Sequence, residues 1–294
     1  MKPVIASAAA IALTALAVPA FAKDGPEVRI HAVARVAVVV EDRADVAVEV
    51  EQGASDLPPI RVTRDGANVR IDGGLRRGPL SIGDGVRNCR SAGDNAGRPG
   101  DGASVEVRGV GRVNLSDAPL IVIRTPRQVN VDAEGAVFGS VGRGAASVEL
   151  GNSGCGDWNV ANTDGPLSLG ISGVGDIRAG TSSALEASVS GSGSLTAGAT
   201  RGLDLSVSGA GDIVVARVDG PADIAVSGVG NVEVRAGTSP NLSISVSGVG
   251  DVDFGGVAGD VDVAVSGAGN VSVARATGSV SRAVAGVGDI RIGE

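Results

Sequence analysis

A repeated acidic position offers the first candidate chemistry in this chain. The phrase Ser-Gly-x-Gly-[Asp/Asn]-[Ile/Val] recurs through the C-terminal half, and its fifth position is an acid or an amide in every copy but one, where Ser194 stands. These residues are Asp157, Asp176, Asp212, Asn231, Asp251, Asn270 and Asp289. Calcium prefers oxygen ligands, so a column of such side chains could hold calcium ions.

The pattern favours a structural role for this column. It resembles the nonapeptide calcium repeats only in part, since those repeats run Gly-Gly-x-Gly-x-Asp, whereas here the acid follows the second glycine directly. Neutral residues separate most of the acids, as repulsion between like charges about 5 Å apart would select. Asp and Asn also share the ability to hydrogen-bond a turn backbone. We predict a structural turn ladder, with calcium binding as the alternative.

Small uncharged residues flank the same phrase on its N-terminal side. Among them are Ser188, Ser190, Ser206, Ser208, Ser245 and Ser247. A smooth strip of this kind could be a docking face for a partner or for a second copy of the chain. The simpler interpretation, which we favour, is that a tight turn excludes larger side chains.

The two cysteines, Cys89 and Cys155, are predicted to form a disulfide. Pairing is the default for two cysteines in an oxidising compartment. On the chain-entropy model, closing a loop of about 66 residues stabilises the fold by roughly 4 kcal/mol. The bond would pin the loop predicted at 84–102 over the repeats.

Catalysis has weak support in the sequence. The single histidine, His31, is expected at an exposed or edge position of a first strand, and neither a Ser-His-Asp site nor a histidine metal site can be built from it alone. Aromatic platforms for sugars are scarce, since the chain has one Trp, three Phe and no Tyr. We predict a protein that is not an enzyme and needs no cofactor, with a polysaccharide-active β-helix enzyme as an alternative.

The spacing of the phrase predicts the architecture. Its first glycines recur every 18 to 20 residues, from Gly154 to Gly286, and Gly135 lies one period earlier. Val, Ile, Leu or Ala alternates with small or polar residues on both sides of each phrase, so each coil should contain two short strands with inward apolar side chains. We predict an all-β, right-handed parallel β-helix, or β-solenoid, with coils of about 19 residues. Arg282 breaks an inward column near the end and is expected in a last, capping coil.

The N-terminal part is predicted to differ from the coils. Residues 1–22 combine Lys2, an apolar run and the sequence Ala20-Phe21-Ala22, which is typical of a cleaved signal peptide. Residues 23–294 are expected to form one solenoid domain, with irregular strands and a loop at 23–118 acting as a cap and regular coils at 119–294. Gly109-Val110-Gly111 resembles an early version of the corner.

Charge and length limit the possible partners. The formal net charge of −8 argues against nucleic acids and anionic membranes. No stretch after residue 22 is long and apolar enough for a membrane helix. The expected partner is an unknown protein or glycan of the cell surface or envelope, and a homo-oligomer could form through the small-residue strip.

Several segments together resemble the GIN domain family. They are the signal peptide, the alternating strands after Glu27, the segment LIVIRTPRQVNVDAEG at Leu120–Gly135 and the run of SGxGD coils. Members of that family are described as putative autotransporter adhesin heads and are exported bacterial proteins. The resemblance implies a right-handed β-helix-like fold and a surface or periplasmic location, with no established catalytic residues. The chain departs from a true autotransporter because no membrane barrel strands precede its end at Glu294.

We therefore predict an exported, non-enzymatic protein of the cell envelope that serves as a structural or adhesive binding module. Its location would be the periplasm, the cell surface or the medium.

Overall fold

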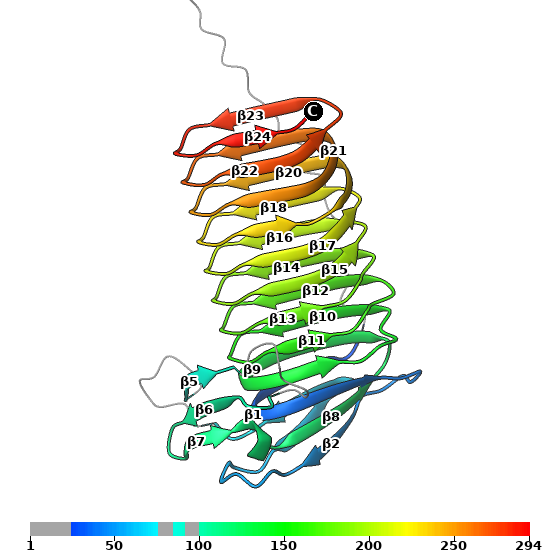
Figure 1. The fold of residues 1–294 in the computed structure, drawn as a ribbon. Coiled ribbons are helices and arrows are strands. Elements are labelled where there is room, and N and C mark those ends of the chain that lie inside the picture. The colour runs from blue at the N-terminus through cyan, green and yellow to red at the C-terminus, as the bar shows by residue number, and fades with distance from the viewer. Residues whose placement is uncertain (1–24, 76–84, 92–99) are drawn as a thin grey trace, which may run out of the picture.

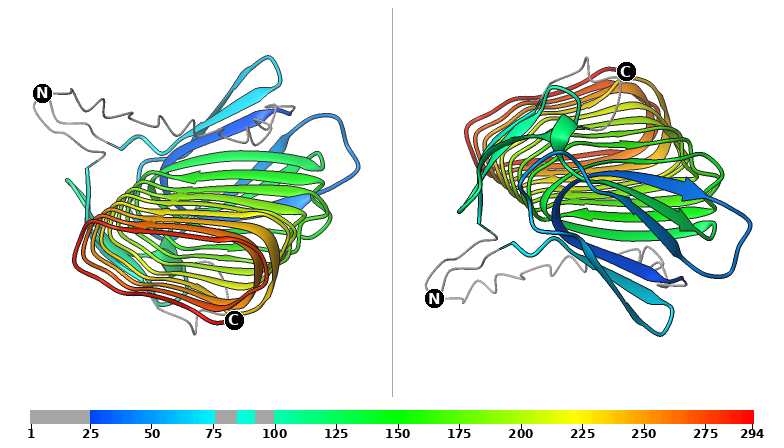
Figure 2. Two further views of the ribbon diagram at one scale, coloured as in Figure 1. Left: turned by 90° about the horizontal axis from the view of Figure 1, so that it is seen from above. Right: turned by 90° about the horizontal axis from the view of Figure 1, so that it is seen from below.

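The computed structural model describes residues 25–75, 85–91 and 100–294, and the predicted signal peptide lies outside these ranges. The fold is a parallel β-solenoid of about nine turns with coils of about 19 residues, so the predicted fold class is confirmed. The C-terminal coil lies at one end of the stack and the N-terminal strands lie at the other (Figure 1). Seen along the stack, the coils overlie one another (Figure 2).

Each regular coil has one strand before its glycine corner and one strand after it. The strands before the corners are β10 (Ser147–Asn152), β12 (Pro166–Ile171), β14 (Ala184–Val189), β16 (Leu203–Val207), β18 (Ala222–Val226), β20 (Gly237–Val246) and β23 (Val280–Val284). The strands after the corners are β11 (Trp158–Val160), β13 (Ile177–Ala179), β15 (Leu195–Thr200), β17 (Ile213–Asp219), β19 (Val232–Val234), β22 (Val271–Ala276) and β24 (Ile290–Ile292). Two long strands, β9 (Gln128–Val141) and β21 (Val252–Val265), continue around a bend of the coil.

Equivalent residues of successive coils pair in parallel and place like side chains above one another. Leu205 pairs with Ile224, which in turn pairs with Ile244, and all three are at most 1% exposed. The interior is one column after another of buried Val, Ile and Leu. Burying each such side chain contributes about 1.5–3 kcal/mol relative to leaving it in water. The inward positions predicted from the repeat therefore form the core.

The N-terminal strands close the first end of the stack. Strand β1 (Glu27–Val40) pairs in parallel with β9 on one edge, and with β4 (Asn68–Asp72) and β8 (Leu120–Thr125) on the other. Two antiparallel strands follow outside these, β2 (Ala47–Glu51) on β8 and β3 (Arg61–Asp65) on β4. This switch to antiparallel pairing ends the repeat and covers the edge that a regular coil would leave open.

A separate small sheet lies beside the first coils. It consists of β5 (Val86–Arg90), β6 (Ser104–Val107) and β7 (Gly111–Asn114), followed by a single 3-10 turn, η2 (Leu115–Asp117). Within the described ranges the structure contains no α-helix. The sheet packs against the solenoid in a second apolar cluster, which includes Val105 of β6, Leu115 of η2 and Phe138 of β9.

Two local predictions were wrong in this sheet. Part of the loop expected at 84–102 is strand β5, because its backbone pairs with the edge of β6, Val86 opposite Val107. Gly109-Val110-Gly111 is the hairpin between β6 and β7, with φ of +82° at Gly109 and +102° at Gly111, and does not form a solenoid corner. The pairing of β6 with β7 is antiparallel, which a coil does not allow.

Arg282 lies where the sequence placed it. It stands in β23 opposite Val263 of β21 and is exposed. Among the described residues β23 has β21 as its strand partner, so Arg282 belongs to the last coil of the stack.

Candidate functional site

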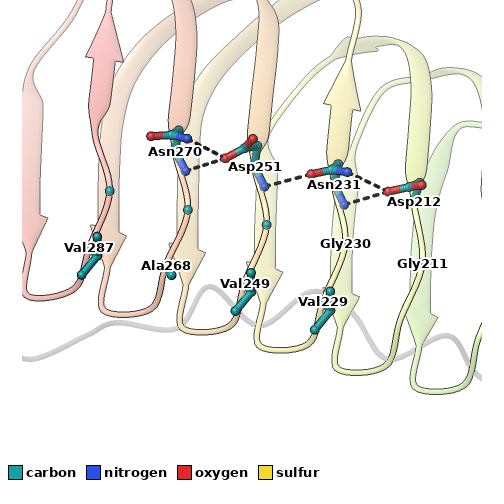
Figure 3. A pocket seen from close by; sticks show the side chains of 13 residues that line it. Gly211, Asp212, Val229, Gly230, Asn231, Val249, Asp251, Ala268, Asn270 and Val287 are labelled. Atoms are coloured by element: carbon teal, nitrogen blue, oxygen red, sulfur yellow. Dashed lines mark hydrogen bonds between the residues drawn. The ribbon is translucent and has the colours of Figure 1, made fainter.

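The glycine corners of the later coils build a groove that runs in the direction of the solenoid axis. We call the residue between the two glycines of each phrase the ridge position and the Asp or Asn after the second glycine the ladder position. The second glycines lie between these two columns. The groove has a volume of about 690 Å3 and is lined by Gly211, Asp212, Val229, Gly230, Asn231, Val249, Gly250, Asp251, Ala268, Gly269, Asn270, Val287 and Gly288. We refer to it as the corner groove (Figure 3).

The floor of the corner groove must be glycine. A Cβ built on Gly211 would lie 1.9 Å from the carbonyl oxygen of Gly193 in the preceding coil, and a Cβ on Gly230 would lie 1.9 Å from that of Gly211. No rotation of a side chain can relieve a clash that involves Cβ itself. The floor is therefore bare backbone, and the ridge and ladder side chains form its two walls.

The ladder side chains join successive coils. Asp251 Oδ1 accepts hydrogen bonds from the backbone N–H of Asn270 at 2.7 Å and from its Nδ2 at 2.9 Å, and Asn270 Oδ1 accepts one from the N–H of Asp289 at 3.2 Å. Asp212 and Asn231 repeat this arrangement two coils earlier (Figure 3). The Asn residues also donate to the carboxylates, which accounts for the alternation of Asp with Asn.

The same arrangement begins at the first well-formed coil. Asp157 Oδ1 accepts from the N–H of Asp176 at 3.0 Å, and Asp176 Oδ1 accepts from the N–H of Ser194 at 2.9 Å. All these bonds reach the next coil, whereas the sequence suggested bonds within one turn. In the part of the chain that the structure describes, no group of three or more His, Cys, Asp or Glu is placed to hold a metal ion.

The ridge was missed from the sequence. Val174, Val229, Val249 and Val287 are 55%, 58%, 54% and 81% exposed, although Val elsewhere in the coils is mostly buried. Between them stand Ser192, Ala210 and Ala268. The available signal was an apolar residue inside a phrase whose other positions are glycine or polar.

The equivalent corner of the first coil, which lies outside the residues that line the corner groove, is covered by the chain itself. The ridge residue Cys155 is only 8% exposed, and it forms a disulfide with Cys89 of β5 with a Cα–Cα distance of 6.4 Å. Two residues beyond Cys89, the hydroxyl of Ser91 donates a hydrogen bond to Asp157 Oδ2. The small sheet thus contacts both the ridge and the ladder of this coil.

The small-residue strip lies on an outer face of the coils. Ser188 lies in β14, Ser206 in β16 and Ser245 in β20. Ser190, Ser208 and Ser247 come directly after these strands, and all six are exposed. Ser188 pairs with Ser206, so the residues stack in the direction of the solenoid axis. The structure thus aligns them on one surface, separate from the corner groove.

A column of acids runs beside the strip. Glu186, Asp204 and Asp223 stand opposite one another in three successive coils. Partial burial, and then the negative charge of Asp223, raise the pKa of Asp204 above its ordinary value.

The expectation for His31 was wrong. It lies in β1 between Asp72 of β4 and Glu134 of β9, so it is not on an edge strand. Its side chain is 11% exposed, and Nδ1 lies 3.9 Å from a carboxylate oxygen of Asp72. The reason is that β1 has partners on both sides, which the sequence pattern of a single strand cannot reveal.

Comparison with known proteins gives a fold-level likeness alone. No family model and no curated protein sequence matches the chain, so its resemblance to the GIN domain family stays a prediction. Two similar solved structures are described as putative adhesins. One is from Bacteroides fragilis (16% identity, 91% of each chain covered, TM-score 0.41). The other is from Parabacteroides distasonis (13% identity, 91% of this chain and 92% of that chain, TM-score 0.44). A third, from Parabacteroides distasonis, is described as a putative lipid binding protein (14% identity, 92% and 93% covered, TM-score 0.39).

Proposed function

We propose that the chain is an exported, non-enzymatic binding module of a bacterial cell envelope, structural or adhesive in its action, and a member of the GIN domain family. The observation that carries the proposal is the row of exposed valines along the corner groove, because a solenoid has ample interior positions for apolar side chains and gains nothing in folding from exposing them. A repeated exposed row is what a partner surface requires.

Export is supported by two features. Residues 1–22 have the composition of a signal peptide, and the Cys89–Cys155 disulfide is typical of an oxidising compartment. No helix among the residues that the structure describes is long and apolar enough to cross a membrane.

The titratable groups support a role without catalysis. The described groups whose pKa is shifted are mostly surface residues held by a neighbour, such as Arg217 with Asp219, where the ion pair raises the pKa of the arginine and lowers that of the acid. Active sites instead place shifted groups together in a cleft.

The proposed partner is a protein or glycan of the surface or envelope.

Cell fractionation tests the proposal. The full chain, expressed with residues 1–22, should appear in the periplasm, on the cell surface or in the medium. Its measured mass should match that of a chain that begins at Lys23. The purified mature protein should release no products from a panel of polysaccharides. Retention of an uncleaved chain in the cytoplasm would contradict export, and polysaccharide breakdown would contradict the non-enzymatic role.

A further inference from the structure

We propose that the corner groove binds an extended polypeptide segment that presents an apolar side chain and, two residues later, a hydroxyl group as hydrogen-bond donor. This inference rests on the proposed binding function and assigns that function to one surface. Its starting point is the first coil, where a segment of the chain itself covers the equivalent corner.

The occupied coil shows how such a segment is held. Cys89 and Ser91 are two residues apart, and they contact Cys155 and Asp157, which are also two residues apart. In an extended chain, side chains at i and i+2 lie on the same face, about 6.6 Å apart. One extended segment can therefore reach the ridge and the ladder of a single coil together.

Later coils repeat the two receiving groups without the covering segment. Val249 takes the ridge position of Cys155 and is 54% exposed, whereas Cys155 is 8% exposed. Asp251 takes the ladder position of Asp157, and its Oδ1 is engaged by Asn270. Its Oδ2, the counterpart of the atom that receives Ser91 at the first coil, accepts no hydrogen bond from the described residues.

The coils differ in whether their ladder residue can accept a further hydrogen bond. At Val229 the ladder residue is Asn231, whose Oδ1 accepts from Asp251 and whose Nδ2 donates to Asp212. At Val287 the second oxygen of Asp289 already accepts from Arg291 at 3.1 Å. A segment with a hydroxyl donor should therefore bind better than one without it at the coil of Val249. No such preference is expected at the coil of Val229, although both valines are similarly exposed.

A polypeptide fits this groove better than other occupants. The floor is backbone, one wall is a row of small apolar side chains, and the other is a row of acceptors spaced by one coil, about 4.8 Å. At the first coil the chain's own polypeptide meets the equivalent two positions, through the disulfide at the ridge and the Ser91 hydrogen bond at the ladder. The occupant we assign is thus an extended segment with the pattern apolar-x-Ser or apolar-x-Thr, supplied by a partner protein.

Disulfide exchange at a single introduced thiol tests the assignment. The probes are short peptides containing Cys-Arg-Ser, taken from residues 89–91, or Cys-Arg-Ala, each activated as a mixed disulfide with thionitrobenzoate. The thiolate of the Val249→Cys protein attacks the peptide sulfur, forms the protein–peptide disulfide and releases one thionitrobenzoate, whose colour gives the rate. The native Cys89–Cys155 bond stays in place because no reductant is added.

The Val249→Cys protein should react about fivefold faster with the Ser peptide than with the Ala peptide, since a hydrogen bond to a charged acceptor is among the stronger ones. The rate with the Ser peptide divided by the rate with the Ala peptide should fall close to one for Val229→Cys. The same should hold for Val249→Cys combined with Asp251→Asn. Val174→Cys, which is paired with Asp176, serves as a second test position if Val249→Cys fails to fold.

A ratio near one at Val249→Cys, or equal ratios at Val249→Cys and Val229→Cys, would overturn the proposal. Self-association of the wild-type protein that is lost on Val249→Asp would also overturn it, in favour of a second copy as the occupant. If the chain is exported but the ratio is one, the groove assignment alone fails. If the ratio holds but the chain stays in the cytoplasm, the proposed function fails instead.

Discussion

The corner at Gly154 and the corners of later coils share a backbone and differ in exposure. At the first coil the small sheet covers the ridge and the ladder, and Cys155 is 8% exposed. One coil later Val174 is 55% exposed at the equivalent position. The local sequence therefore sets the shape of the corner, whereas a segment distant in sequence decides whether that corner meets solvent.

The largest effect should come from breaking the shared corner backbone. Gly211→Ala places a Cβ 1.9 Å from the carbonyl oxygen of Gly193 and should force two coils apart. We expect a loss of more than about 4 kcal/mol in the free energy of unfolding, or failure to fold. Chemical denaturation followed by circular dichroism measures the loss.

Gly109→Ala is the matched control for that change. Gly109 has a φ of +82° but no atom within 4 Å of a built Cβ, so the cost should be only about 1–2 kcal/mol of backbone strain. Equal losses for the two variants would contradict the close contact between coils at the corner.

Removing the disulfide should loosen the cover and leave the stack intact. Cys89→Ser with Cys155→Ser should cost about 2–4 kcal/mol. Hydrogen exchange should quicken in β5 to β7 and stay unchanged in β16 to β20. Faster exchange throughout the later coils would show that the cover also supports the stack.

The ladder should contribute less. Asp251→Ala removes the acceptor for two donors of Asn270 and should cost about 1 kcal/mol, whereas Asp251→Asn keeps an oxygen acceptor and should cost less. Thermal unfolding of the two variants gives the difference. A melting temperature that is unchanged in both would leave the ladder without a stabilising role.

The smallest effect should appear in the acidic column. Because the pKa of Asp204 is raised in the folded state, the folded protein binds more protons than the unfolded chain between the ordinary and the raised pKa. This group's contribution to stability is therefore most favourable below that window and falls as pH rises through it. Asp223→Asn should lower the pKa of Asp204 by removing a neighbouring negative charge.

Carboxyl carbon chemical shifts followed against pH report that pKa directly. Asp262→Asn is the control, because Asp262 lies in the same column but pairs with Ser243 and Ser281. An equal change in the pKa of Asp204 in both variants would contradict the conclusion that the neighbouring charge of Asp223 raises this pKa.

The repeat was predictable because each coil carries the same information. Val, Ile and Leu recur at fixed numbers of residues from the glycines. This recurrence predicted which side chains are buried, as Leu205 and Ile224 show. Arg282 could be placed in the last coil for the same reason, since a single exception is visible against a regular column.

The rest depends on contacts between distant segments that follow no period. Val28 pairs with Val131, and the two residues lie in stretches of sequence that no repeat connects. The same pairing encloses His31, and the pairing of β5 with β6 converts part of a predicted loop into a strand. The ridge was missed because a valine in a turn phrase indicates neither burial nor exposure until its cover is known.

Labelling of single thiols at three corners tests the central comparison most directly. Cys155 is retained in a Cys89→Ser protein, while Val174→Cys and Val249→Cys are each made with Cys89→Ser and Cys155→Ser. Without the disulfide the small sheet is looser, but Val105 and Val107 of β6 share an apolar cluster with Phe138 of β9 and Cys155, so the sheet should still shield Cys155. We predict that Cys155 reacts with a thiol reagent at least about tenfold more slowly than the other two thiols, as its lower accessibility requires. Equal rates at all three positions would contradict a solenoid whose first glycine corner is covered and whose later corners are open to solvent.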